Sequence, residues 1–256
     1  MTARLRLAEM IIGIVPIALL VALWHALAAS GIAPPSLLPR PAVVFARLAE
    51  QLANSLFLGH LATTLFRLFC GFAIAAFLGV ALGLAASASR TGEALLKPLV
   101  RVLAPVPKIA LYPALLLVLG FEHASKIALV AVDAVFPILL ATWQGAAMVE
   151  RPLVWSARAA GVPPMRCLFT VVLMAAMPSI LTGCRIGLVI ACIVVFLAEM
   201  ITSTDGLGHL LVRAARNFQT VDMFVPIIAI SLLGLLLNLG FNALRARLLI
   251  GFPEER

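Results

Sequence analysis

The sequence predicts an all-α, polytopic membrane protein, and two features carry this prediction. Hydrophobic residues make up 63% of the 256 residues and charged residues only 12%, whereas a soluble domain carries about 25% charged residues. The apolar runs are also spread along the whole chain, which leaves no room for a sizeable soluble domain. Because lipid offers no partners to backbone N–H and C=O groups, runs of this kind cross a membrane as helices.

Six runs approach the length of about 20 apolar residues that a membrane-spanning helix needs. We expect one membrane domain over 1–256, with a connecting loop at about 150–177 and spans at about 10–29, 68–89, 102–121, 127–149, 178–201 and 223–244. The first run follows basic residues, as a signal peptide does, but it is longer than the 7–15 apolar residues typical of one. We interpret it as a retained span, and cleavage after it is the alternative.

Two of these runs are irregular. The third contains Lys108 and three prolines, so we expect a short span with an irregular beginning and with Lys108 reaching out toward the polar boundary. The run 168–198 is too long for one simple span and too short for two. We therefore expect a lead-in segment followed by one span that begins near Pro178.

The distribution of Lys and Arg predicts the orientation, because cytoplasmic loops carry the excess of these residues. Five lie in loops of the outer set: Arg40, Arg47, Lys126, Arg213 and Arg216. Eleven lie on the other side: Arg4, Arg6, Arg90, Lys97, Arg101, Arg151, Arg158, Arg166, Arg245, Arg247 and Arg256. This bias predicts that both termini are cytoplasmic. On the outer side, 41–58 is typical of an amphipathic helix with Val44, Leu48, Leu52 and Leu56 on one stripe.

Several function classes are disfavoured by what the chain lacks. Its basic residues, net charge +8, are scattered between apolar runs, which argues against nucleic-acid binding. No G-x-x-x-x-G-K-[ST] occurs, so the chain has no loop of this type for ATP phosphates. No H-E-x-x-H, G-x-S-x-G or C-x-x-C occurs either, and the four cysteines are typical of small buried hydrophobes. We expect no metal, no cofactor and no catalytic residue on this chain.

The residues 155–178, WSARAAGVPPMRCLFTVVLMAAMP, form the connecting loop between the fourth and fifth spans. Trp155 to Ala160 are helix-compatible, and Gly161 with the following prolines ends the helix. We expect a short helix that projects into the cytoplasm. Composition alone favours an ordinary solvated loop helix.

Small residues and charges within the spans are the remaining candidates. Gly71, Ala75, Gly79 and Gly83 recur every four residues, which favours close helix packing within the bundle or at a dimer seam over a solute path.

Arg67, Lys108 and Arg185 lie at the ends of the predicted spans or inside them, and the charged residues that are candidates for the pathway or gate are Asp133, Arg185 and Glu199. Asp133 is a candidate for the pathway or gate by default; pairing with Lys126 and a purely structural role are the alternatives. For Arg185 we favour snorkelling or bonds to nearby carbonyls over contact with an anion. For Glu199 we favour ordering of the outer loop over gating.

The loop resembles that of ABC-importer permeases, whose pattern is E-A-A-x-x-x-G, nine residues, then I-x-L-P. Trp155-Ser156-Ala157 occupies the E-A-A places, Gly161 the glycine place, and 171–174 (VVLM) the last places, with the spacing kept. Trp155 and Met174 depart from the family's glutamate and proline. The resemblance implies a coupling helix that docks on a separate ATPase through Trp155, Ser156, Ala157, Arg158, Gly161, Val171 and Leu173.

Further blocks resemble the nitrate/sulfonate/taurine-type subfamily, in the expected order over about 35–250. They are LPRPAVVFARL (38–48), the stretch 99–130, FPILLATWQG (136–145), PSILTGCRIGL (178–188) and AEMITSTDGLGHLL (198–211). The resemblance implies a type I ABC importer permease in a bacterial inner membrane. It would work with a cytoplasmic ATPase, an extracytoplasmic solute-binding protein and a second permease copy.

On this resemblance we expect a non-enzymatic subunit that forms the pathway for a small polar or anionic solute, surrounded by membrane lipid. A standalone ion-coupled secondary transporter that uses Asp133 is the alternative from another class, although no convincing internal repeat is present. An intramembrane enzyme is disfavoured by the absence of a catalytic constellation. The sequence does not identify the solute.

Overall fold

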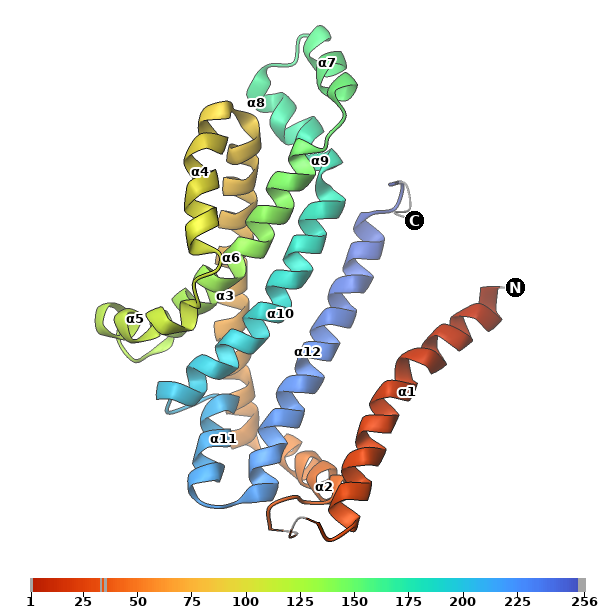
Figure 1. Ribbon diagram of the computed structural model, residues 1–256, viewed down its shortest axis with the longest axis vertical. Helices are drawn as coiled ribbons and strands as arrows, with labels where there is room; N and C mark the ends of the chain where they lie inside the picture. Colours follow the sequence, from red (N-terminus) through yellow and green to blue (C-terminus); the bar gives the residue numbers. More distant parts are fainter. Residues whose placement is uncertain (1, 33, 35, 253–256) are drawn as a thin grey trace.

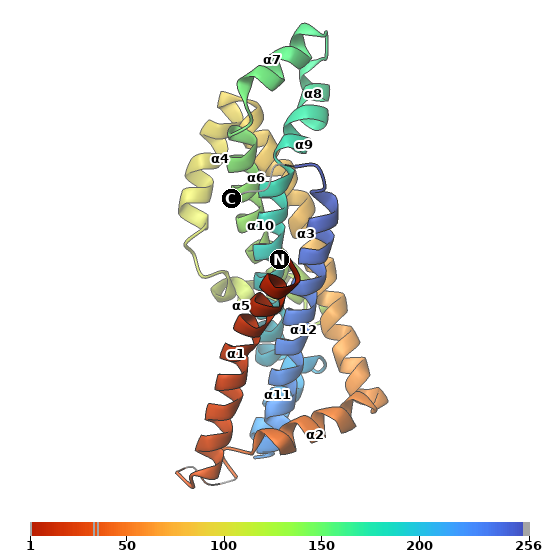
Figure 2. The same cartoon turned by 90° about the vertical axis from the view of Figure 1, so that its right-hand side faces the viewer.

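The computed structural model describes residues 2–32, 34 and 36–252, and their side chains except those of 2–14 and 90. Throughout this part of the chain the regular structure is helical, which confirms the all-α prediction. Figures 1 and 2 show an elongated bundle, with α7 at one end and with α2 and α11 at the other. These are called the α7 end and the α11 end below.

Most of the long helices run along the bundle, the first helix of the chain diverges from them toward its N-terminal end, and the short helices connect them (Figure 1). In chain order the helices are α1 (Thr2–Ala29), α2 (Pro41–Leu52), α3 (Ser55–Ala88), α4 (Arg90–Leu103), η1 (Lys108–Leu111), α5 (Tyr112–Leu119), α6 (His123–Ala147), α7 (Arg151–Ala159), α8 (Pro164–Cys167), the π-helical turn η2 (Leu168–Val172), α9 (Leu173–Ala175), α10 (Met177–Thr202), α11 (Leu207–Arg216) and α12 (Thr220–Leu248).

Four helices in the described ranges are long and apolar enough to cross a membrane, namely α3, α6, α10 and α12. Two further pieces, Thr91–Leu103 and Lys108–Leu119, meet at 87° and are apolar enough only when taken together, so they form either a broken fifth span or a re-entrant loop. In α1, the stretch whose side chains are described, Val15–Ala29, is a shorter apolar helix. Helix α3 begins at Ser55, earlier than the predicted start of the second span.

The region predicted as one short span, 102–121, is therefore not a single helix in the structure. Helix α4 ends at Leu103 and the chain turns before η1 begins at Lys108. Pro105 and Pro107 lie in this turn, and proline cannot donate the backbone hydrogen bond that would continue a helix. The prolines predict the irregular beginning, but the sharp change of direction comes from packing against α6 and α10.

Helix α3 packs closely along α6 because its small residues face that helix. A Cβ added to Gly71 would lie 2.6 Å from Val130, one on Gly79 2.8 Å from Ile138, and one on Gly83 2.6 Å from Thr142. These distances leave no room for a side chain, so the glycines permit close approach of the two helices. The structure thus places the stripe within the bundle of one chain.

A second glycine set joins α6 to α10, and the sequence analysis did not identify it. An added Cβ on Gly183 would lie 2.6 Å from the Cβ of Ala141, and one on Gly187 2.9 Å from Ile138. Ile138 therefore fits between glycines of both neighbouring helices. The main core is formed chiefly by α3, α6 and α10, and Tyr112 and Leu116 of α5 complete it.

A smaller core at the α11 end joins α2, α3, α11 and α12 through Val44, Leu48, Phe57, Leu207, Leu210, Val225 and Ala229. Helix α2 buries Val44 and Leu48, as its pattern predicts. The predicted stripe stops there: Leu52 is half exposed, and Leu56 lies on α3 and is exposed. The predicted single helix over 41–58 is therefore wrong, since Asn54 ends the first helix and caps α3 by accepting from the Leu56 N–H.

Candidate functional site

Helix α10 presents one exposed apolar stripe in an otherwise buried helix. Its opposite face carries Ala191, Val195 and Ala198, which are fully buried. The stripe itself comprises Ile186, Val189, Ile193, Leu197 and Ile201, which are 48%, 45%, 55%, 39% and 52% exposed. Their spacing of three or four residues places them along one side of the helix. We call this set the α10 stripe.

A cavity of about 830 Å³ lies between the α10 stripe and α12. Its walls are mostly apolar, and the polar groups among them are Thr182, Arg185, Ser231 and Asn238. The Arg185 Nε donates to the Asn238 Oδ1 on α12, 2.9 Å away. The partner is therefore a side chain across the cavity and not the nearby carbonyls that the sequence analysis favoured. Arg185 is exposed in this position.

The other side of the α10 stripe borders a smaller cavity of about 340 Å³, whose lining includes Lys108 and Asp133. The Lys108 Nζ lies 3.7 Å from the Asp133 Oδ1, donates to the Ala104 carbonyl at 2.8 Å and stands 4.5 Å from the centre of the Phe136 ring. Lys108 is only 8% exposed. Its predicted outward reach is wrong because these partners hold it inside.

The suggested pair between Asp133 and Lys126 does not form. The Lys126 Nζ instead donates to the carbonyls of Phe121 and Glu122, just before its own helix α6. Lys126 is fully buried at this position. The structure therefore brings Asp133 and Arg185 to opposite flanks of the α10 stripe, each with a polar partner from another helix.

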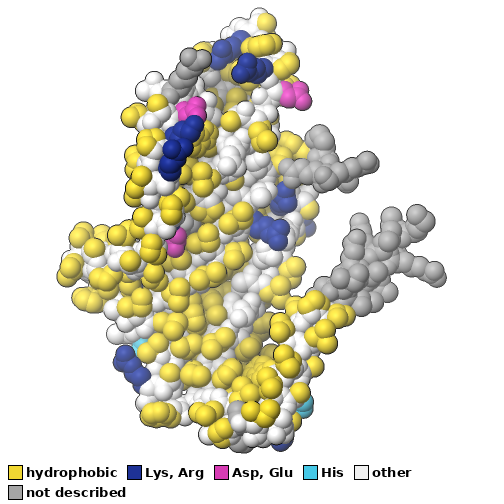
Figure 3. All heavy atoms as spheres, in the orientation of Figure 1, with side chains coloured by type: hydrophobic (Ala, Val, Ile, Leu, Met, Phe, Trp, Pro, Cys, Tyr) yellow, Lys and Arg dark blue, Asp and Glu magenta, His cyan; other side chains and the backbone are white. Residues whose placement is uncertain are grey.

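Figure 3 shows that hydrophobic side chains cover most of the face on which α10 and α12 lie and that few charged side chains interrupt them. A face of this kind suits contact with lipid or with another apolar protein surface. Two of the charged groups that border this face have polar partners, Arg185 in Asn238 and Asp133 in Lys108.

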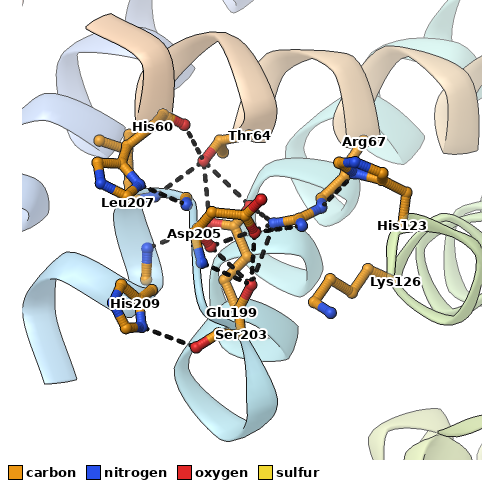
Figure 4. A network of polar contacts seen from close by, with 12 residues as sticks. His60, Thr64, Arg67, His123, Lys126, Glu199, Ser203, Asp205, Leu207 and His209 are labelled. Carbon is orange, nitrogen blue, oxygen red and sulfur yellow. Dashed lines mark hydrogen bonds and ion pairs between the residues drawn. The ribbon is translucent and has the colours of Figure 1, made fainter. Parts of the chain in front are cut away.

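A buried polar network fastens α3 to the α10–α11 connection (Figure 4). Arg67, on α3, is 1% exposed, and its guanidinium donates to the Glu199 Oε1 at 2.9 Å and to Ser203 and the Asp205 carbonyl at 3.2 Å. It also pairs with the Asp205 carboxylate and contacts the His123 Nδ1. We call these residues, with His60, Thr64 and Glu199, the Arg67 network.

Glu199 is fully buried, yet each of its oxygens has a donor. Besides Arg67, the Thr64 hydroxyl donates at 2.9 Å and the Gly208 N–H at 3.1 Å. A charge buried in this way is tolerated when it is paired and its remaining lone pairs are satisfied. The predicted ordering of the loop by Glu199 is consistent with these contacts, which join the end of α10 to the start of α11.

The turn between α10 and α11 is tied down by backbone contacts as well. The Gly206 N–H donates to the His60 Nδ1 at 3.0 Å, and the Leu207 N–H donates to the Thr64 hydroxyl at 2.9 Å. Gly206 has φ of 96°, a conformation that favours glycine. An added Cβ there would also collide with the Glu199 carboxylate. The turn is therefore built around the buried acid.

Asp205 lies in this turn, beyond the end of α10. Partial burial disfavours its charged form, but the hydrogen bond and the positive charge of Arg67 outweigh burial and lower the pKa of the Asp205 carboxyl. Asp205 therefore remains ionised and balances Arg67 together with Glu199.

Sequence reasoning missed Arg67 as a functional residue and assigned it only to the end of a span. A signal was present, since Arg67 is a cation within an apolar helix and Thr64 and His60 lie on the same helical face. Glu199 is an acid at the same end of another apolar helix. A cation in one apolar helix and an anion near the same end of another are candidates for a buried pair, which forms once the two helices are placed at equal depth.

The predicted coupling segment lies at the opposite end of the molecule. Helix α7 protrudes beyond the bundle (Figure 1), and Trp155 is 62% exposed, with Ser156 and Arg158 also exposed. Gly161 has φ of 80°; its N–H donates to the Arg158 carbonyl at 2.9 Å and the Val162 N–H to the Ala157 carbonyl at 3.1 Å. This pair of bonds is a Schellman motif, which ends a helix at a glycine.

The chain returns from α7 through α8 and the π-helical turn η2 into α10. Val171 lies in this turn and Leu173 follows in α9, and both are half-buried. Val172 and Leu173 pack against the main core. The protruding helix is thus connected to α10 through residues that pack against the main core.

Comparison with known proteins identifies the family. The family model for the inner membrane component of binding-protein-dependent transport systems matches residues 71–249. This chain belongs to that family. It is therefore the permease subunit of an ABC importer, as the sequence predicts.

Curated relatives of this permease match nearly its whole length. A putative aliphatic sulfonates transport permease from Bacillus subtilis is 32% identical, covering 91% of this chain and 84% of the relative. The taurine transport system permease of Escherichia coli is 31% identical, covering 91% and 86%. A formylaminopyrimidine transport permease from Halalkalibacterium halodurans is 31% identical, covering 89% of each chain.

Among solved structures, the permease resembles a chain of the inward-facing MetNI methionine ABC transporter. The TM-score is 0.58 at 20% identity, and the match covers 80% of this chain and 96% of that chain. At this identity the likeness establishes the fold alone. It confirms the prediction of an ABC importer type I permease-like fold.

Proposed function

We propose that this permease forms one wall of a pathway for small organic anions and that the α10 stripe is this wall. The carrying observation is that α10 exposes five apolar residues between two flanking polar pairs, Lys108–Asp133 and Arg185–Asn238. An apolar wall provides no strong binding to delay a solute, and the polar pairs supply the few oriented groups that a solute site needs.

The wall requires an opposite wall, and a second copy of the same chain provides it. One chain leaves the α10 stripe uncovered along its length. A two-fold axis beside α10 would bring the same stripe of two copies face to face, which is the usual symmetry of a homo-oligomer. The proposed unit is therefore a homodimer embedded in lipid.

The proposed orientation places the α7 end and both chain termini in the cytoplasm and the α11 end outside. The Lys and Arg count supports this, with eleven in the cytoplasmic set predicted from the sequence and five in the outer set. In this orientation α7 faces the cytoplasm of a bacterial cell, and α2 and α11 face the extracytoplasmic side. The membrane is the inner, or plasma, membrane.

Two partner proteins follow from this orientation. A separate cytoplasmic ATPase would dock on α7 and perform all ATP hydrolysis, so this chain itself carries no cofactor and no metal. An extracytoplasmic solute-binding protein would deliver the solute to the α11 end. The family description, which names a binding-protein-dependent system, supports both partners.

The proposed solute class is a small sulfonate or a related organic anion. Relatives named for aliphatic sulfonates and for taurine support this class. The exposed guanidinium of Arg185 at the edge of the large cavity offers an anion a charge-assisted partner in exchange for Asn238.

Uptake by the reconstituted complex tests the proposal. Proteoliposomes that contain the permease, its ATPase and its binding protein should accumulate ethanesulfonate or taurine only with ATP inside. Uptake that needs no ATP and no ATPase but follows a proton gradient and is lost in Asp133→Asn would overturn it in favour of an ion-coupled carrier. Accumulation of neutral solutes but of no anion would overturn the proposed solute class alone.

A further inference from the structure

A separate cavity of about 360 Å³ lies at the α11 end, between the end of α10, the connection that follows it and α11. A volume of this size lies within the range of small-ligand pockets. Its walls are rich in polar groups, and the lining comprises Met200, Ile201, Thr202, Ser203, Thr204, His209, Val212, Arg213, Arg216 and Asn217. We call it the outer cavity.

Among the described residues, the outer cavity is lined by two arginines and by no acid. Arg213 and Arg216 both line it, one helical turn apart on α11. Across the described part of the chain, Arg47 and Arg67 form ion pairs with acids, whereas Arg213 and Arg216 do not. The acids nearest in the sequence are Asp205 and Asp222, and neither lines the outer cavity. Asp205 is engaged with Arg67, and Asp222, which lines a separate pocket together with Arg213, is paired with Arg47.

The remaining polar groups of the outer cavity are held in place. The His209 Nδ1 lies 2.7 Å from the Ser203 carbonyl and therefore donates to it, which fixes the ring. The Ser203 hydroxyl donates to the Asp205 carbonyl at 2.6 Å, and Arg67 donates to Ser203. The Arg67 network thus fixes the wall of the outer cavity from behind, and Thr204 and Asn217 add exposed polar groups at the cavity.

The outer cavity continues the α10 stripe. Ile201, the last residue of the stripe, lines the cavity, while Arg185 borders the stripe at its other end. Sixteen helical residues separate these two positions, which corresponds to about 24 Å. An apolar wall therefore runs between a cationic cavity at the α11 end and a single guanidinium deeper in the bundle.

We propose that the outer cavity is an oxyanion-binding site that receives the sulfonate group, or an equivalent anionic group, of the solute before it passes along the α10 stripe. Arg213 and Arg216 would hold the oxygens through their planar guanidinium forks, which suit such groups geometrically. Thr204 and Asn217 would supply further hydrogen bonds. This proposal rests on the proposed function, because it assigns the outer cavity to the same anionic solute.

Thiol labelling of the full complex tests the site. Thr204→Cys places a thiol in the outer cavity, and its reaction rate is measured with a methanethiosulfonate that carries a sulfonate and with one that carries a quaternary ammonium. Complex without this change gives the background from the native cysteines. The sulfonate reagent should react about tenfold faster than the cationic one, because a cleft lined by one sign of charge concentrates counter-ions. Ethanesulfonate should slow the reaction.

Charge-removing variants give the matched comparison. In the Thr204→Cys background, Arg213→Gln with Arg216→Gln should abolish both the preference and the protection. Arg40→Gln removes an exposed arginine at the same end of the molecule but outside the cavity, and it should change neither. Co-purification of the ATPase verifies that each variant is assembled.

The outcomes separate this site from the proposed function. Equal rates for the two reagents, or no protection by ethanesulfonate, would overturn the site even if the complex imports sulfonates. Protection by the solute-free binding protein and not by ethanesulfonate would also overturn it, because the arginines would then receive an acidic side chain of that partner. If the complex without substitutions does not import sulfonates, but labelling and protection are as expected, the proposed function is contradicted and the binding site is still supported.

Discussion

At the residue scale, the Arg67 network illustrates why a buried charge depends on its partners. Arg67 and Glu199 are almost completely inaccessible, at 1% and 0% exposure, and their guanidinium and carboxylate meet at 2.9 Å. Removal of both charges at such a place costs little, whereas removal of one leaves the other desolvated and uncompensated. The residues were visible in the sequence, but their pairing depends on the relative depth of two helices, which the sequence does not specify.

This asymmetry gives a prediction. Arg67→Met should destabilise the detergent-solubilised permease by about 3–5 kcal/mol, because Glu199 would keep only Thr64 and Gly208 as donors. The double variant Arg67→Met with Glu199→Leu should recover a large part of this loss. The measurement is the thermal unfolding midpoint followed by tryptophan fluorescence. A double variant that is less stable than the single one would contradict the assignment.

At the element scale, the long apolar helices could be predicted and the break in the third span only in part. Runs of uncharged residues predict α10 and α12 to within a few residues of their ends, because a membrane-spanning helix needs such a run. The turn at Pro105 and Pro107 was predictable as an irregularity. The direction of this turn was not predictable, because it depends on which neighbours α5 and η1 pack against. The glycine contacts between α6 and α10 were not predictable for the same reason.

Glycines in two of the spanning helices provide a matched test of packing. Gly79→Ala should destabilise the permease by about 1–3 kcal/mol, since its Cβ would lie 2.8 Å from Ile138 and overpacking of a filled interface is costly. Gly234→Ala on α12 meets nothing within 4 Å and should leave stability unchanged or raise it by about 0.5–1 kcal/mol through helix propensity. Thermal unfolding in detergent measures both, and equal effects would contradict the packing role of Gly79.

At the scale of the whole molecule, the charged and exposed features are divided between the two ends of one bundle. The Arg67 network and the outer cavity occupy the α11 end, and the exposed helix α7 occupies the other, with α10 running between them (Figure 2). Sequence spacing predicted α7 because a glycine and prolines end it. It could not predict that α10 would also carry an exposed apolar stripe, since exposure of one helical face is decided by the packing of all the others.

Two predictions concern α7 and the ATPase proposed to dock on it. Trp155→Ala should weaken association with the ATPase at least tenfold, because a large exposed aromatic on a protruding helix is the type of residue that dominates an interface. Phe218→Ala, which removes an even more exposed aromatic at the α11 end, serves as the matched control and should leave association unchanged. Co-purification and titration of the ATPase measure both.

Gly161→Val should also disturb the contact between α7 and the ATPase, but through backbone strain and not through loss of a contacting side chain. Gly161 has φ of 80° with open space around it, so valine introduces backbone strain of about 1–2 kcal/mol and no clash. The end of α7 should shift while the bundle still inserts and folds, and transport with the ATPase should be lost. Normal transport by both the Trp155 and the Gly161 variants would show that force reaches α10 by some route other than α7.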